Sequence, residues 1–201
     1  MSQSHEDTKT WSVGIMVAFY VLLAAAGVGL AHWHGGGWGL WLPDRAASPC
    51  AGLGGAVCAG LSLFGGLLFG GAIVWLTRLG TKYWSALRAM RDAFGDVLSG
   101  LSRSDVFLVA ISSAVAEELL FRGALLPILG IWWSTTVFAL LHVPMGRGLA
   151  FWPLFAFIVG LGLASITLGT GTVLGAMVAH FVTNYWNLLD IVDQGLRDES
   201  T

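Results

Sequence analysis

Apolar stretches long enough to cross a membrane follow one another along most of this chain. A membrane-spanning helix needs about 20 mostly apolar residues, and the sequence predicts six passes, at residues 11–31, 52–77, 105–127, 131–143, 149–168 and 172–192. Of the 201 residues, 56% are hydrophobic and only 11% are charged, which is too little polar surface to cover a soluble globule. We therefore expect an all-α, polytopic membrane helix bundle that forms a single domain over residues 1–201. The first pass is long and no clear A-x-A site follows it, so we interpret it as a retained helix rather than a signal peptide.

The segment 78–103 differs from the passes on either side of it. Apolar residues recur there every three or four positions, at Tyr83, Leu87, Met90, Phe94, Val97 and Leu101. This spacing indicates an amphipathic helix, and we expect it to lie on the membrane surface. The segment holds five of the ten Lys and Arg residues, so the positive-inside rule predicts that it is cytoplasmic. Two passes before it and four after it then place both termini in the cytoplasm, in what we expect to be a bacterial inner membrane.

Three charged residues lie inside the third predicted pass. They are Glu117, Glu118 and Arg122. A charged side chain at the centre of a membrane helix costs about 2.5–3.5 kcal/mol on insertion scales, so these groups need partners or a function. Glu118 and Arg122 are four residues apart and can pair on one helix face. Glu117 points about 100° away around the helix, and it therefore needs a different partner.

Candidate partners for Glu117 lie in later passes at a matching depth. His142 ends the fourth pass, and His180 and Asn184 lie one turn apart in the sixth. Counted from the nearest turns, Glu117 and the two histidines each lie roughly 15–18 Å from the extracytoplasmic side. A carboxylate, two imidazoles and an amide at one level predict a hydrolytic site, in which the carboxylate takes a proton from water and the other groups stabilise the anion that forms.

A metal-dependent version of this site remains an alternative. Glu117, His142 and His180 could bind a divalent ion such as zinc and leave an open position for water. The other version uses no cofactor, and we favour it because Asn184 and the adjacent glutamates suit hydrogen bonding better than ligation. Cys50 and Cys58 have no zinc-site spacing, so we interpret them as two small apolar residues.

Three short motifs occur in order on separate predicted helices. They are E-E-x-x-x-R, F-x-x-x-H and H-x-x-x-N, formed by Glu117, Glu118, Arg122, Phe138, His142, His180 and Asn184. Over about residues 105–190 the sequence resembles the CPBP family, which contains the type II CAAX prenyl endopeptidases and bacteriocin-processing proteins. The resemblance implies that Glu117 activates water and that His142 and His180 hold that water or a metal. It further implies that Asn184 stabilises the oxyanion and that the other three residues are supporting.

The function expected from the residues and the resemblance is that of an intramembrane protease. Its substrate would be a membrane-anchored protein or peptide, cut near its anchored, C-terminal segment, as in bacterial family members that resemble sorting proteases. One alternative is a non-catalytic family member that acts as a bacteriocin immunity factor or a membrane scaffold. Another is a small proton-coupled transporter, although no inverted repeat of broken helices is visible. We expect no nucleic-acid partner.

Overall fold

The computed structural model describes residues 2–34, 48–98, 100–142 and 146–198, and within these ranges every regular element is a helix. The elements are α1 (Ser2–Trp33), η2 (Ala51–Leu53), α2 (Gly55–Tyr83), α3 (Ser85–Leu98), α4 (Arg103–Glu118), the π-helix η3 (Leu119–Leu125), α5 (Leu126–Leu141), η4 (Arg147–Leu149), α6 (Trp152–Thr170) and α7 (Leu174–Asp198). The predicted all-α membrane bundle is confirmed.

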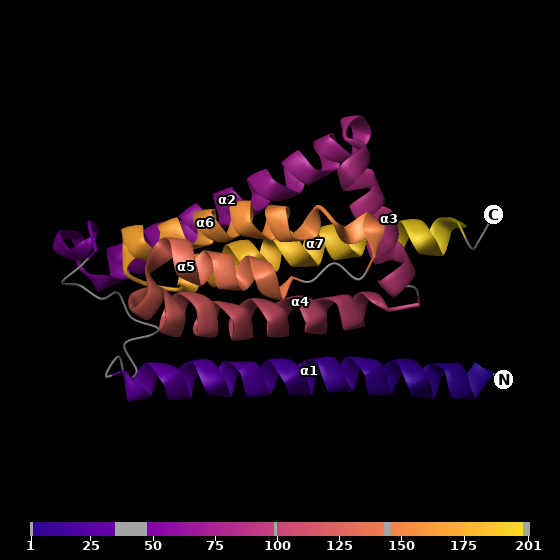
Figure 1. Ribbon diagram of the computed structural model, residues 1–201, viewed down its shortest axis with the longest axis horizontal. Coiled ribbons are helices and arrows are strands. Elements are labelled where there is room, and N and C mark those ends of the chain that lie inside the picture. The colour runs from indigo at the N-terminus through magenta and orange to yellow at the C-terminus, as the bar shows by residue number, and fades with distance from the viewer. Residues whose placement is uncertain (1, 35–47, 99, 143–145, 199–201) are drawn as a thin grey trace.

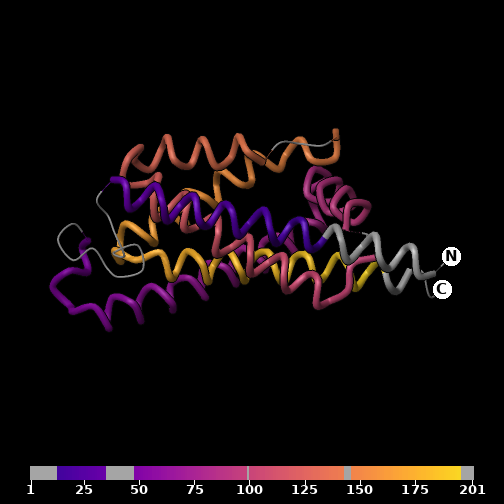
Figure 2. The backbone as a smooth tube through the Cα atoms, turned by 90° about the horizontal axis from the view of Figure 1, so that it is seen from below, coloured from indigo at the N-terminus to yellow at the C-terminus, as the bar shows by residue number. Residues whose placement is uncertain are grey.

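The long helices lie side by side, and the chain crosses the bundle repeatedly (Figure 1). The start of α1, the end of α2, the short helix α3 and the end of α7 all lie at one end of the bundle. The start of α2 and the connection between α6 and α7 lie at the opposite end. Figures 1 and 2 show α1 along the side of the bundle formed by α4 and η3, which are its main contacts.

Four helical stretches in the described ranges are long and apolar enough to cross a membrane, namely Val13–Trp33, Gly55–Tyr83, Arg103–Leu141 and Arg147–Thr170. The third contains two of the predicted passes, because Gly130 adopts a non-helical conformation (φ 71°, ψ 173°) that interrupts the helix. Figure 1 shows α5 running in the direction opposite to α4. Beyond Gly130 only residues 131–141 remain in α5, about 16 Å of helix. This is about half the roughly 30 Å thickness of a bilayer core, so this part of α5 is too short to cross the apolar layer by itself.

The last predicted pass corresponds to α7, which is not one of the four apolar stretches. It is more polar because His180, Asn184, Asn187 and Asp190 recur along it. The helix packs against α2, α4 and α6, so neighbouring helices surround much of its length. Its polar side chains can therefore be satisfied within the protein.

Small residues bring α2 and α7 into close contact. A Cβ added at Gly70 would lie 2.8 Å from the carbonyl oxygen of Ala179, and one added at Gly66 would collide with the backbone of Gly175. The hydroxyl of Ser62 also accepts a hydrogen bond from the Gly175 amide at 2.9 Å. Gly66 and Gly70, which are four residues apart, therefore allow α2 and α7 to approach closely.

The amphipathic segment forms its own helix, α3, but its apolar face packs on protein. Leu87 and Met90 are buried in a cluster with Leu149, next to Trp152 and Phe155 at the start of α6. The prediction of an amphipathic helix is correct. Part of its apolar face packs against η4 and the start of α6, and its place at the membrane surface stays a prediction.

Cys50 and Cys58 form a disulfide with their Cα atoms 5.8 Å apart. The interpretation of these cysteines as two small apolar residues was therefore wrong, since spacing can exclude a zinc site without excluding a bond across the start of α2. Just before the disulfide, the Ser48 hydroxyl donates to the Gly169 carbonyl at 2.9 Å. This bond ties the segment to the end of α6.

Candidate active site

The fold brings Glu117, His142 and His180 together. Oε2 of Glu117, on α4, lies 4.0 Å from Nε2 of His142 and 3.9 Å from Nε2 of His180. His142 follows the last residue of the short helix α5, and His180 lies on α7. Three helices thus supply one buried cluster, as the depths counted from the sequence predict.

Glu118 and Arg122 form the expected ion pair next to this cluster. Their side chains meet at 2.8 Å and are 0% and 2% exposed. Arg122 also donates to the Gly160 carbonyl at 3.2 Å, and its guanidinium lies 4.3 Å from the centre of the Phe138 ring. A Cβ at Gly160 would lie 3.1 Å from the guanidinium, so this glycine makes room for the charged group.

Hydrogen bonds at the Nδ1 atoms orient both imidazoles. Nδ1 of His142 lies 2.7 Å from the Phe138 carbonyl oxygen, and Nδ1 of His180 lies 2.8 Å from Oε1 of Glu118. Both partners are acceptors, so each Nδ1 carries the proton and each Nε2 faces Glu117. The Phe138 ring lies 4.4 Å from the His142 ring and 6.2 Å from the His180 ring, between centroids. Phe138 therefore supports both rings.

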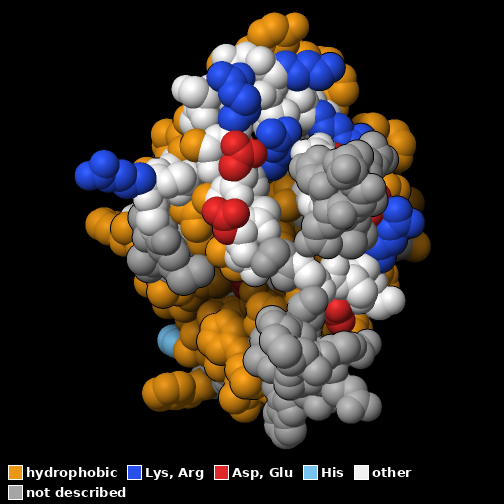
Figure 3. All heavy atoms as spheres, turned by 90° about the vertical axis from the view of Figure 1, so that its right-hand side faces the viewer, with side chains coloured by type: hydrophobic (Ala, Val, Ile, Leu, Met, Phe, Trp, Pro, Cys, Tyr) orange, Lys and Arg blue, Asp and Glu red, His pale blue; other side chains and the backbone are white. Residues whose placement is uncertain are grey.

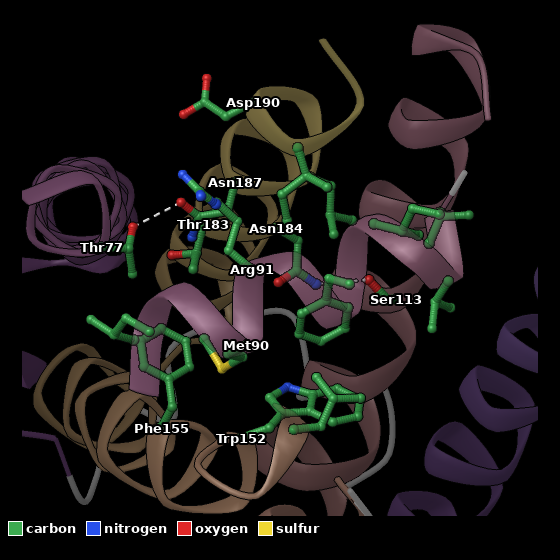
Figure 4. Close-up of a pocket in the computed structure, with 18 of the residues that line it drawn as sticks. Thr77, Met90, Arg91, Ser113, Trp152, Phe155, Thr183, Asn184, Asn187 and Asp190 are labelled. Carbon is green, nitrogen blue, oxygen red and sulfur yellow. Dashed lines mark hydrogen bonds between the residues drawn. The ribbon is translucent and has the colours of Figure 1, made fainter. Parts of the chain in front are cut away.

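Asn184 lies one turn beyond His180 and points into the same region. Its Nδ2 atom donates to the Ser113 hydroxyl at 3.1 Å (Figure 4). Ser113 is on α4, one turn before Glu117, and it is not among the residues predicted from the sequence. Its spacing of four residues from Glu117 was the available signal, but a small uncharged residue rarely stands out in a membrane helix.

A cavity of about 320 Å³ begins at this cluster and runs between α2, α3, α4, α6 and α7. One wall is apolar, with Met90, Trp152 and Phe155, and polar groups such as Thr77 and Asn187 lie across from it (Figure 4). Along α7 the lining extends from His180 to Gln194. The cavity therefore leads from the cluster toward the end of the bundle that carries α3.

That end of the bundle is rich in positive charge. Figure 3 shows Lys and Arg side chains gathered on it. Two ion pairs brace the helices there: Arg78 with Asp190 at 2.6 Å, and Arg103 with Asp193 at 3.0 Å. The 78–103 segment and the helix ends at both termini thus share one face, as the charge pattern predicts.

The residues that could bind a metal do not fit one as they are placed. A tetrahedral zinc ion bound at about 2.0–2.2 Å holds its donor atoms about 3.3 Å apart. Glu117 Oε2 is 4.0 and 3.9 Å from the two imidazole nitrogens. Within the described ranges, no group of three His, Cys, Asp or Glu side chains is arranged to hold a metal ion.

These features define a polytopic membrane protein with a buried carboxylate–imidazole centre at the bottom of an amphipathic cavity. Residues 100–186 match the Type II CAAX prenyl endopeptidase Rce1-like family, and this segment contains all four candidate catalytic residues. The segment is therefore Rce1-like, and the resemblance predicted from the three motifs is confirmed.

The chain is also similar to a curated protein over a segment of comparable length. The chain is 34% identical over 91 residues to the uncharacterized protein YpbD of Bacillus subtilis (strain 168), and the alignment covers 43% of this chain and 45% of YpbD. The chain thus spans less than half the length of that relative. No solved structure matches the chain.

Proposed function

We propose that this protein is an intramembrane endopeptidase in which Glu117 activates the attacking water. One observation carries the proposal. Oε2 of Glu117 is buried without a hydrogen-bond partner among the described residues, and it faces two imidazole nitrogens at 3.9 and 4.0 Å. A separation of about 4 Å is too long for direct hydrogen bonds but suits a water molecule that bonds to both sides. The match to an endopeptidase family supports this use of the site.

The geometry supports a sequence of steps at named atoms. A water donates one hydrogen to Glu117 Oε2 and the other to Nε2 of neutral His142. Glu117 takes the proton while the water oxygen attacks the peptide carbonyl carbon. The second amide hydrogen of Asn184 and the imidazole of His180 stabilise the oxyanion. The C–N bond then breaks as Glu117 returns the proton to the leaving nitrogen.

The substrate we propose is a membrane-anchored protein or peptide, cut near the anchored, C-terminal segment. An amphipathic cavity suits a segment that leaves the apolar layer, since its walls offer both apolar and polar contacts. The cavity leads toward the basic end of the bundle. The scissile bond therefore enters from that end.

We propose that the basic end faces the cytoplasm of a bacterial inner membrane. Lys and Arg gather there, as the positive-inside rule requires. The Cys50–Cys58 disulfide lies toward the other end, with the start of α2, and disulfides persist in oxidising compartments outside the cytoplasm. The positions of the Lys and Arg residues and of the disulfide thus independently support an orientation in which the basic end is cytoplasmic.

The test of catalysis is Glu117→Gln, which keeps the shape of the side chain but cannot accept a proton from water. The assay follows cleavage of quenched-fluorescence peptides that join an apolar segment of about 20 residues to a varied flanking region, using purified protein in detergent. We expect the rate to fall by about 10²–10⁴-fold with the melting temperature retained. Cleavage by Glu117→Gln at the wild-type rate would contradict the mechanism. A wild-type protein that cleaves none of the peptides would favour the scaffold or immunity function.

A further inference from the structure

A tyrosine from α1 completes the surroundings of Glu117. The Tyr20 side chain lines the same cavity as Glu117, and its hydroxyl lies within reach of the Glu117 carboxylate. Helix α1 lies outside the segment 100–186 that matches the endopeptidase family. The contact is therefore an addition to the family-like site from another part of the chain.

Close packing fixes α1 beside the site. A Cβ at Gly27 would lie 2.9 Å from the Cα of Leu120 and 3.0 Å from the carbonyl carbon of Leu119, at the start of η3. Gly27 follows Tyr20 by seven residues, or two helical turns, so the two share one face of α1. These contacts reach the first residues after Glu117 and Glu118, so α1 is fixed directly against the catalytic stretch of chain.

Contacts on the other side of Tyr20 fix the same face. Val13, seven residues before Tyr20, is buried in a cluster with Leu101 and Val106 of the α4 region. Ala24, one turn after Tyr20, packs next to Leu119. Tyr20 thus lies on α1 between two packed regions, which fix the position of the helix beside Glu117.

The Glu117 carboxylate has few other groups near it that could fix its orientation. Oε2 of Glu117 has no hydrogen-bond partner among the described residues, and the imidazoles of His142 and His180 lie beyond direct hydrogen-bonding distance. The neighbouring Glu118 is engaged by Arg122 and His180. Tyr20 is therefore the hydroxyl donor that can set the rotation of the Glu117 carboxylate.

We propose that Tyr20 is a positioning residue of the active site, and that α1 is part of the catalytic centre rather than only a membrane anchor. The inference rests on the proposed function. The Tyr20 hydroxyl donates to Glu117 and holds the carboxylate facing His142 and His180, where it can take the proton from water. No bond to the substrate is needed for this role.

The first test is Tyr20→Phe, which removes the hydroxyl and keeps the ring. We expect kcat to fall by about 10-fold or more, as for loss of a hydrogen bond to a charged group, with KM changed by less than about twofold and the melting temperature retained. Tyr83→Phe is the matched control, since Tyr83 is 73% exposed at the end of α2 and its variant keeps full activity. Tyr20→Phe with the wild-type kcat would overturn the proposal.

The second test does not depend on activity. Infrared spectra of the purified protein contain a carboxyl band that can be assigned to Glu117 by its loss in Glu117→Gln. We expect this band to move in Tyr20→Phe and to stay in place in Tyr83→Phe. A band that does not move in Tyr20→Phe overturns the proposal whatever the activity. A band that moves in a protein that cleaves nothing supports the Tyr20 contact and contradicts the endopeptidase function, so the two failures are distinguishable.

Discussion

Arg122 shows how closely structure and chemistry are linked at the level of single residues. Its guanidinium forms an ion pair with Glu118, donates a hydrogen bond to the Gly160 carbonyl and lies over the ring of Phe138. Glu118 in turn holds Nδ1 of His180. The orientation of one imidazole in the proposed site therefore depends on an arginine that does not reach the cavity.

Replacing Arg122 with alanine is expected to destabilise the fold. The change leaves a buried Glu118 carboxylate without its cation, which costs about 3–5 kcal/mol. We predict a lower yield of folded protein and a lower melting temperature in detergent, together with loss of activity. An Arg122→Ala protein that melts at the wild-type temperature would contradict the structural importance of the pair.

The effect of chelators separates the two versions of the hydrolytic site. Because the donor atoms at Glu117, His142 and His180 are spread too widely for a bound metal, we predict that enzyme treated with EDTA or phenanthroline keeps its rate. Activity is measured before and after metal depletion, and metal content is checked by elemental analysis. Loss of activity that zinc or another divalent ion restores would establish the metal-dependent scheme.

The charged residues of the site could be predicted from the sequence, whereas several of their partners could not. Glu117, Glu118 and Arg122 stand out because charge inside a membrane helix is costly, and the histidines follow from matching depth. Ser113, Gly160 and Tyr20 carry no such cost. Their roles depend on how the helices pack. Gly160 contacts Arg122 and Tyr20 lies near Glu117, and both come from helices that are distant from α4 and η3 in the sequence.

Among the elements, the contact of α2 with α7 is the one most open to test. Gly66→Ala places a methyl group against the Gly175 backbone, so the two helices must separate. Overpacking of this kind costs about 1–3 kcal/mol, and we predict a lower melting temperature and lower activity, since α7 carries His180 and Asn184.

The neighbouring Gly65 provides the control for this prediction. A Cβ at Gly65 meets nothing within 4 Å, and alanine is the better helix former by about 1 kcal/mol. Gly65→Ala is therefore expected to leave stability unchanged or slightly raised. Equal melting temperatures for the two variants would show that the close approach of α2 and α7 is not needed.

Other elements show where periodicity is informative and where it is not. The three- and four-residue spacing of apolar side chains predicts α3, but it cannot tell a membrane surface from η4 and α6 as the partner of that face. The π-helix η3 follows from no spacing in the sequence. Gly130 could be placed as a turn because it lies between two apolar runs, and its positive φ confirms the turn.

For the whole molecule, the orientation in the membrane is the main prediction. We expect Arg88→Cys to react with a membrane-impermeant maleimide only from the cytoplasmic side, since Arg88 is on α3 at the basic end. The two native cysteines are joined in the disulfide, so they give no background. Labelling of residue 88 only from outside would reverse the orientation.

The pairing of Glu118 also has a consequence for how this chain enters the membrane during synthesis. Arg122 lies on the following turn and is made at almost the same time, whereas His180 comes 62 residues later. At roughly 5–20 residues per second, that interval lasts about 3–12 s. Throughout it, the emerging α4–η3 helix contains both charges of the ion pair and can neutralise itself without help from other helices. The order of charges along one helix thus allows the nascent chain to cross the bilayer before His180 has been synthesised.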